Sequence, residues 1–462
     1  MQDLTKDTIT RNLLRTAGFM LVTMVFQTLY ILVDLYFVGR LGKEAVAGVA
    51  VAGNLQFVVL AATQVLGVGT TTMVAHAVGK RDHDAAQHAF NQSQSLSMLV
   101  GFAFFLVSML IRTSYANMQA ADPITAQAAA DYLYWFLPAL GLQFAIVAMA
   151  SALRGAGNFR PGMVVQTTTV VINIVLAPVL IFGWGTGHPL GVGGAALATF
   201  IGVAVGVVWL AAIFVPRTAY LRFEPTHLKP RLATWSGLLK IGLPAGAEFA
   251  LTAVNLFIVY SVTRPFGAEA QAGYGIGSRV LQASFMPVVA VAFAAAPIAG
   301  QNFAAGLGDR VKEVFRLAAT MASGVMALMM VLSFFAAEAM IGIFSSDPTV
   351  MQVGGEYLKI ICWSFVASGI IFVASSMFQA MGNTLPPLFA SLSRLVVFAI
   401  PSYLLSRVEG FQLHWIWYLS AIAIVLQLAA ILWLLQREFR VKLSQPRPQT
   451  AAETLTVVPD LM

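Results

Sequence analysis

The chain has 462 residues, of which 58% are hydrophobic and only 10% charged, and its formal net charge is +7 at pH 7. Soluble proteins are about 45–50% apolar and about 25% charged, so this composition excludes an ordinary chain of soluble domains. The apolar runs are long and do not alternate with a period of two, which also excludes an outer-membrane barrel. We therefore predict an all-α polytopic membrane protein.

The apolar runs are each long enough to cross a bilayer, for which a helix needs about 20 residues. In chain order they lie near residues 14–38, 49–78, 89–111, 132–152, 162–184, 191–215, 236–263, 272–303, 315–343, 357–381, 386–406 and 413–436. Gly, Pro, Asn and Asp, which favour turns, separate them, as in GRLG over 39–42 and SSDP over 345–348. We expect twelve transmembrane helices with short loops.

The basic residues indicate how the helices are oriented. If the N-terminus is cytoplasmic, most of the 27 Lys and Arg residues fall in cytoplasmic segments. Cytoplasmic loops of membrane proteins are enriched in these residues, so we place both termini in the cytoplasm of a cell with an inner membrane. This distribution explains the positive charge without a nucleic-acid partner.

An internal repeat gives the strongest organisational signal. An offset of 225 residues superposes the turn pairs Asp122-Pro123 on Asp347-Pro348 and Gly157-Asn158 on Gly382-Asn383. It also pairs His76 with Gln301, a position to which we assign no catalytic role. Each half has an even number of spans, so both halves enter the membrane in the same sense. Transporters built from such parallel repeats bind substrate between them, although channels and membrane enzymes also contain duplicated bundles.

The repeat and a polar segment with three prolines define the expected domains. We predict two pseudo-symmetric six-helix lobes, with the substrate cavity between them. They are an N-lobe over 1–215, a cytoplasmic linker over 216–235, a C-lobe over 236–440 and a disordered cytoplasmic tail over 441–462.

Two acids lie clearly within predicted spans, Asp34 in the first and Glu248 in the seventh. An ionised side chain at mid-bilayer costs about 2.5–3.5 kcal/mol on insertion scales, so each acid is a functional candidate. From the rise of a helix, Asp34, Asn173 and Thr199 occupy similar depths in the outer half of the N-lobe. Because desolvation favours a neutral carboxyl group, Asp34 could exchange a proton. A purely structural, hydrogen-bonded Asp34 is the alternative.

Two further features fall near the middle of the membrane. Glu248 could attract a cation into the substrate cavity, or it could pair with Asn255 or Tyr260 on its own helix. Arg394 could bind an anion in that cavity or neutralise an acid, and we favour neutralisation. Pro178 follows Asn173 by five residues and is a candidate hinge, because proline bends or breaks helices.

Three segments resemble the multidrug and toxic compound extrusion (MATE) family, and most closely its DNA-damage-inducible (DinF-type) branch. They are ILVDLYFVGRLGKEAVAGVAVAG over 31–53, NIVLAPVLIFGWG over 173–185 and AAAPIAGQNFAAG over 294–306. The resemblance covers essentially the whole chain. It implies a secondary antiporter that exports cationic or amphipathic organic compounds in exchange for H⁺ or Na⁺. By position it assigns ion coupling to Asp34, Asn173 and Thr199.

The chain departs from that family's pattern at two places. The helix 5 pattern N-x-x-x-D-P has Ala177 in place of its acid, and residues 359–378 in the tenth span contain no acid. A hard cation such as Na⁺ is bound by several oxygen ligands, whereas a proton needs one carboxyl group. We therefore expect H⁺ coupling. Coupling to Na⁺ at Asp34, Asn173 and Thr199 is the second choice.

The remaining expectations concern partners and chemistry. A single Cys362, six His residues without metal-ligand spacing and the lack of a catalytic cluster predict neither an enzyme nor a cofactor other than the coupling ion. We expect a monomer whose partners are a small organic substrate and membrane lipid. The alternative is a flippase for lipid-linked oligosaccharides or polysaccharides, which would need cationic groups to bind pyrophosphate.

Overall fold

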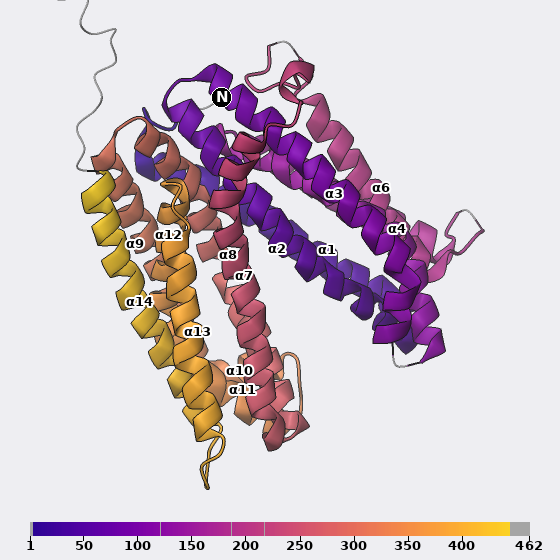
Figure 1. Ribbon diagram of the computed structural model, residues 1–462. Helices are drawn as coiled ribbons and strands as arrows, with labels where there is room; N and C mark the ends of the chain where they lie inside the picture. The colour runs from indigo at the N-terminus through magenta and orange to yellow at the C-terminus, as the bar shows by residue number, and fades with distance from the viewer. Residues whose placement is uncertain (1–2, 121, 186, 217, 444–462) are drawn as a thin grey trace, which may run out of the picture.

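The computed structural model describes residues 3–120, 122–185, 187–216 and 218–443, and it is all helical (Figure 1). Twelve segments of these residues are long and apolar enough to cross a membrane, which confirms the predicted fold class. The helices are α1 (Ile9–Gly39), α2 (Lys43–Gly79), α3 (His83–Gln119), α4 (Pro123–Gly155), α5 (Arg160–Phe182), α6 (Gly191–Ala212), α7 (Leu232–Thr263), α8 (Ala268–Ala304), α9 (Gly308–Phe335), α10 (Ala337–Gly342), α11 (Pro348–Ile361), α12 (Phe365–Ala380), α13 (Leu385–Leu405) and α14 (His414–Lys442). Three short 3₁₀ turns lie at Pro225–His227, Arg264–Phe266 and Cys362–Ser364.

Two of the predicted spans are interrupted. The run expected over 315–343 ends at Phe335, and its last part forms the separate helix α10. This short helix contains Glu338, whose carboxylate pairs with Lys359 Nζ at 2.7 Å. The span expected over 357–381 begins earlier, at Pro348, and a 3₁₀ turn divides it into α11 and α12.

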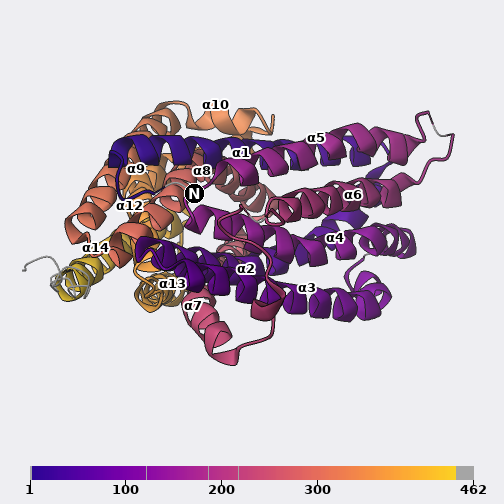
Figure 2. The same ribbon diagram turned by 90° about the horizontal axis from the view of Figure 1, so that it is seen from above.

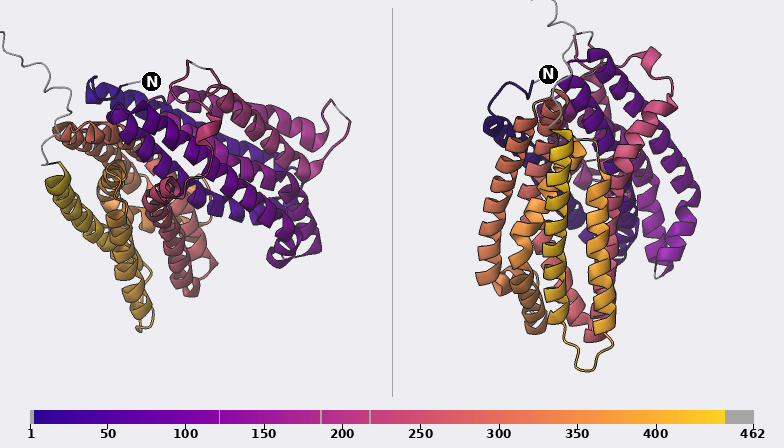
Figure 3. Two further views of the ribbon diagram at one scale, coloured as in Figure 1. Left: turned by 45° about the horizontal axis from the view of Figure 1, so that its top comes forward. Right: turned by 60° about the vertical axis from the view of Figure 1, so that its left-hand side comes forward.

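The helices form two bundles, the N-lobe from α1–α6 and the C-lobe from α7–α14. Figures 1 and 3 show that the bundles lie close together at the end that carries the N-terminus and diverge toward the opposite end. The loop between α13 and α14 lies at that opposite end. We call the first end the closed end and the second the open end. The predicted tail lies almost entirely outside the described residues, which stop at 443.

The first helix of each repeat crosses from one bundle to the other. In α1, Leu13 is buried in the hydrophobic core of the C-lobe, whereas Val38 belongs to that of the N-lobe. In α7, Leu238 packs into the N-lobe core and Val259 into that of the C-lobe. Leu13 and Leu238 are equivalent positions of the repeat, so the two lobes exchange matching segments. Figure 2, viewed from above, shows α1 extending across both bundles.

The predicted repeat is visible in the loops and in the packing. Asp122 caps α4 by accepting from Ile124 N and Thr125 N, and its repeat mate Asp347 caps α11 in the same way. Gly48 approaches the neighbouring helix so closely that an added Cβ would lie 2.8 Å from Ala129 N. The equivalent Gly273 would meet Gly354 N at 2.9 Å, and residue 354 is itself the repeat mate of residue 129.

Hydrogen bonds between the lobes follow the same repeat at the closed end. His76 Nε2 in α2 lies 2.6 Å from Ala380 O at the end of α12. Gln301 Nε2 in α8 donates to Gly155 O at the end of α4, at 2.8 Å. Because both the side chains and the carbonyls are repeat mates, these two contacts form a symmetric pair, which we call the clasp.

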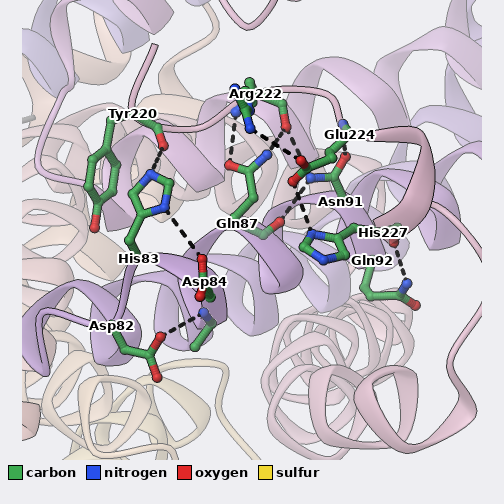
Figure 4. Close-up of polar contacts among 11 residues, drawn as sticks. Asp82, His83, Asp84, Gln87, Asn91, Gln92, Tyr220, Arg222, Glu224 and His227 are labelled. Carbon is green, nitrogen blue, oxygen red and sulfur yellow. Dashed lines mark hydrogen bonds and ion pairs between the residues drawn. The ribbon is translucent and has the colours of Figure 1, made fainter. Parts of the chain in front are cut away.

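The segment that joins the lobes is bound along the polar face of α3 (Figure 4). Gln87 exchanges hydrogen bonds with the backbone N–H and C=O of Arg222. Asn91 Oδ1 accepts from Glu224 N at 2.9 Å, and Gln92 Nε2 donates to the carbonyl of His227 at 2.6 Å. These bonds satisfy the backbone of a segment whose one regular element is the 3₁₀ turn at Pro225–His227, so the described part of the connection is fixed to the N-lobe.

Candidate functional site

The three residues expected to couple an ion come together inside the N-lobe. Asp34 of α1, Asn173 of α5 and Thr199 of α6 are only 7%, 2% and 7% exposed. Asn173 Nδ2 donates to Thr199 Oγ1 at 3.2 Å. The hydroxyl of Tyr30, one helical turn before Asp34, lies 2.9 Å from the same Thr199 oxygen. Side chains four residues apart share a helix face, so Tyr30 connects the amide and hydroxyl pair to the side of α1 that bears Asp34.

A second tyrosine completes the surroundings of the carboxyl group. The hydroxyl of Tyr132, from α4, donates a hydrogen bond to Asp34. Within the described parts of the chain, Asp34 Oδ1 and Asn173 Oδ1 are both buried without a hydrogen-bond partner. Such acceptors are rare in native proteins because leaving them unsatisfied is costly. The cluster therefore offers two oxygens to a proton or to a small cation.

The helix that carries Asn173 is continuous through the candidate hinge. Pro178 lies inside α5, which continues to Phe182. Ala177 is fully buried one turn from Asn173, so an apolar methyl group stands where a second acid would have entered the cluster. Whether α5 bends at Pro178 stays a prediction.

Sequence reasoning missed both tyrosines of this cluster. A signal for Tyr30 was available, because its four-residue spacing from Asp34 places both side chains on one face. Tyr132 reaches Asp34 from α4, a helix distant in the sequence, so the local sequence gives no signal for this contact.

Glu248 and Arg394 both line a separate cavity inside the C-lobe. The cavity has a volume of about 100 Å³ and lies among α7, α8, α12, α13 and α14. Glu248 Oε1 accepts hydrogen bonds from Ser375 Oγ at 3.1 Å and Ser391 Oγ at 3.2 Å. Gln427 Nε2 in turn donates to Ser391 Oγ at 3.1 Å. The acid is thus bonded to residues of two other helices, and a residue of a third helix fixes one of them.

These partners differ from the ones that the sequence suggested for Glu248. Neither Asn255 nor Tyr260 bonds to the carboxylate among the described residues; two serines do. Serine is common in transmembrane helices, so its occurrence alone gave no signal. The predicted site residues therefore divide into two groups, with Asp34, Asn173 and Thr199 in one lobe and Glu248 and Arg394 in the other.

Comparisons with known proteins agree with this architecture. Among curated proteins, the probable multidrug resistance protein YoeA of Bacillus subtilis is 25% identical over 416 residues, which are 88% of this chain and 90% of that protein. The multidrug export protein MepA of Staphylococcus haemolyticus is 26% identical over 79% of this chain and 80% of its own. The FAD transporter of Shewanella oneidensis is 23% identical over 80% of this chain and 82% of its own.

Solved structures share the fold. An outward-facing multidrug resistance MATE family transporter of the MOP superfamily superposes with a TM-score of 0.88 at 22% identity, covering 96% of this chain and 98% of the other. The Vibrio cholerae MATE transporter VcmN in its bent form gives 0.86 at 22% identity, covering 96% and 99%.

A family model supplies the identification. The MatE model matches twice, over residues 20–179 and 244–404, and the two matches are offset by nearly the length of the internal repeat. Together they cover more than half of the chain. The chain therefore belongs to the MatE family of membrane transporters and is not an enzyme.

Proposed function

We propose that this protein is a secondary active antiporter of the inner membrane that exports cationic or amphipathic organic compounds in exchange for H⁺. We place it in the DinF-type branch of the family, on the resemblance of residues 31–53, 173–185 and 294–306. The names of relatives, among them multidrug export and multidrug resistance proteins, support small organic molecules as substrates. We further propose that it acts as a monomer and needs no cofactor beyond the coupling ion.

The observation that carries this proposal is the buried carboxyl group of Asp34, whose Oδ1 is without a partner among the described residues. A buried charge is expensive in a membrane unless it is compensated. Protonation removes that charge, so the N-lobe can alternate between a protonated state and a state in which a cation compensates the carboxylate.

The oxygens around Asp34 favour a proton over Na⁺. Thr199 Oγ1 is already bonded to Asn173, Tyr30 and the carbonyl of Ala195. A metal ion would have to displace those bonds to use this oxygen as a ligand, whereas a proton requires only the carboxylate. Na⁺ coupling through Asp34, Asn173 and Thr199 is the weaker form of the proposal.

The shape of the molecule supports transport by alternating access. Basic residues gather at the closed end, among them Lys80 after α2, Arg154 near the end of α4 and Arg310 near the start of α9. We therefore propose that the closed end and both termini face the cytoplasm. The bundles then diverge toward the outside, where a proton could reach Asp34 and substrate could leave. Pro178 is the proposed point at which α5 bends as Asp34 changes charge.

The test is transport by the purified protein in liposomes. Vesicles loaded with ethidium would be given either an inward-directed proton gradient without sodium or a sodium gradient without a pH difference. We expect efflux with the proton gradient alone, and efflux only with sodium would contradict H⁺ coupling. Asp34→Asn should abolish this efflux, and Asp131→Asn is its matched control, because this acid is exposed on α4. If neither gradient moves the dye, the proposed antiport is wrong.

A further inference from the structure

The C-lobe cavity contains an arginine that no protein acceptor engages. Arg394 follows Ser391 by three residues on α13, so both side chains face the cavity. A guanidinium carries five N–H donors. Across the parts of the chain that the structure describes, none of them has a hydrogen-bond acceptor, and no carboxylate forms an ion pair with Arg394.

The acid of the cavity takes its hydrogen bonds from residues other than this arginine. Glu248 and Arg394 interact electrostatically across the cavity. The hydrogen bonds to Glu248, however, come from Ser375 and Ser391, and Gln427 fixes Ser391. A buried ion pair stabilises a protein only when its two charged groups are in direct contact with good geometry, because their attraction otherwise does not offset the cost of desolvation. The neutralising role that we favoured for Arg394 stays a prediction, since the two charges still interact across the cavity.

A third polar group points to a ligand independently. Gln427 is only 3% exposed and lines the cavity, and its Oε1 atom has no partner within the described residues. The cavity therefore presents a carboxylate, an unengaged guanidinium and an unengaged amide oxygen. Its walls also include the rings of Phe249, Phe293 and Phe372.

We propose that this cavity selects zwitterionic organic molecules, taking a carboxylate of the substrate on Arg394 and its cationic group on Glu248. The inference rests on the proposed export of small organic compounds and narrows their class. Guanidinium and carboxylate groups form paired, charge-assisted hydrogen bonds, which gives Arg394 a geometric preference for this anion. A volume of about 100 Å³ accommodates the polar end of such a molecule, and the phenylalanine rings can contact its apolar part.

Two dyes that differ in a single group test the proposal. Rhodamine 110 carries a carboxylate and a delocalised cation, and rhodamine 123 is its methyl ester, which has only the cation. Binding of each dye to the purified protein in nanodiscs would be measured by fluorescence anisotropy. The variants are Arg394→Gln, Arg394→Lys and, as a matched control, Arg279→Gln, since Arg279 lies in α8 outside the cavity.

We expect the wild-type protein to bind both dyes. Loss of charge-assisted hydrogen bonds in Arg394→Gln should weaken binding of rhodamine 110 by about 10-fold or more. The same variant should bind rhodamine 123 unchanged or more tightly, because a repulsive charge is removed. Arg394→Lys should fall between wild type and Arg394→Gln for rhodamine 110, and the control should match wild type for both dyes.

Three outcomes would overturn the inference while leaving the proposed function intact. They are binding of rhodamine 123 but not rhodamine 110 by the wild-type protein, an unchanged affinity of Arg394→Gln for rhodamine 110, and equal losses for both dyes. If the wild-type protein binds neither dye, the proposed export of organic cations fails together with the inference.

Discussion

The internal repeat is preserved in the contacts at the closed end of the molecule but not in the polar residues of its membrane interior. At the closed end, His76 and Gln301 are repeat mates, and so are the carbonyls of Ala380 and Gly155 that they contact. In the interior, the mate of Asp34 is Val259, and that of Glu248 is a threonine whose hydroxyl bonds to its own helix. Closing two similar lobes can use equivalent contacts, but coupling an ion to a substrate needs two different sites. The repeat therefore supplies a symmetric scaffold and an asymmetric interior.

The largest effect should follow from removing the acid of the N-lobe. Asp34→Asn preserves size and hydrogen bonding but cannot exchange a proton, so we expect dye efflux to fall to the background of cells without the protein. Accumulation of a fluorescent cation in intact cells measures this, with Asp131→Asn as the control. If Asp34→Asn, at equal abundance in the membrane, exports the dye as fast as the wild-type protein, proton coupling does not depend on Asp34 in the N-lobe as proposed.

Removing the acid of the C-lobe should have a smaller and different effect. Glu248→Gln leaves the proton site intact but removes the charge that attracts a cation, so we expect affinity for rhodamine 123 to fall by about 10-fold. Efflux at saturating dye should stay driven by a proton gradient. Loss of gradient-driven transport at all dye concentrations would instead assign coupling to Glu248.

Weakening the clasp should change the relative populations of the conformation closed at this end and the conformation open at this end. His76→Ala removes one hydrogen bond worth about 1 kcal/mol, which corresponds to a shift of about fivefold away from the conformation closed at this end. His76→Gln installs the residue of the repeat mate and should restore the balance.

The distance between two spin labels at the open end measures how far the lobes are separated there, and so shows the effect of the clasp. Lys43, at the start of α2, and Glu409, between α13 and α14, are exposed sites for a distance measurement between the lobes. The population with the longer distance should decrease in His76→Ala and recover in His76→Gln. Identical distance distributions in all three proteins would remove the clasp from the conformational change.

The linker should loosen when its side-chain supports are removed. Gln92→Leu deletes the bonds to the carbonyls of His227 and Lys229 and to the amide of Arg231. Hydrogen exchange of residues 220–231 should rise about fivefold or more, as expected for a loss of roughly 1 kcal/mol of local stability. Substitution of the exposed Gln119, at the other end of α3, is the control. Unchanged exchange would mean that packing alone holds the linker.

The smallest effects should come from the paired helix caps. Asp122→Ala and Asp347→Ala each remove a cap at equivalent positions, so both should lower thermal stability slightly and by similar amounts. The hydrogen bond from Thr125 lowers the pKa of Asp122, so its stabilising effect is present at neutral pH and is lost as the pH falls through that lowered value. Unequal losses at neutral pH would show that the two halves rely differently on these caps.

Much of the fold could be predicted because its signals are local. Apolar runs set the spans, and turn residues such as those at Asp122 and Asp347 fixed the register of the repeat. The end of α9 at Phe335 was missed because the apolar run continues beyond it with Glu338 as its single charged residue. The 3₁₀ turn at Cys362–Ser364 likewise has no strong breaker in its sequence.

The candidate sites could be predicted only in part. Charge in an apolar span identifies Asp34, Glu248 and Arg394 without any knowledge of packing. Tyr132 and Ser375 become partners of these acids through contacts between distant helices. Such contacts depend on the crossing of the helices, which one sequence does not specify.

Proton release on substrate binding tests the central claim most directly. Rhodamine 123 would be added to the purified protein in weakly buffered solution near neutral pH, and the change in pH recorded. If binding of the cation is coupled to loss of the proton from Asp34, the wild-type protein should release up to about one proton per bound dye and Asp34→Asn none, because linkage between two ligands is reciprocal. Equal proton release by the two proteins would contradict the account.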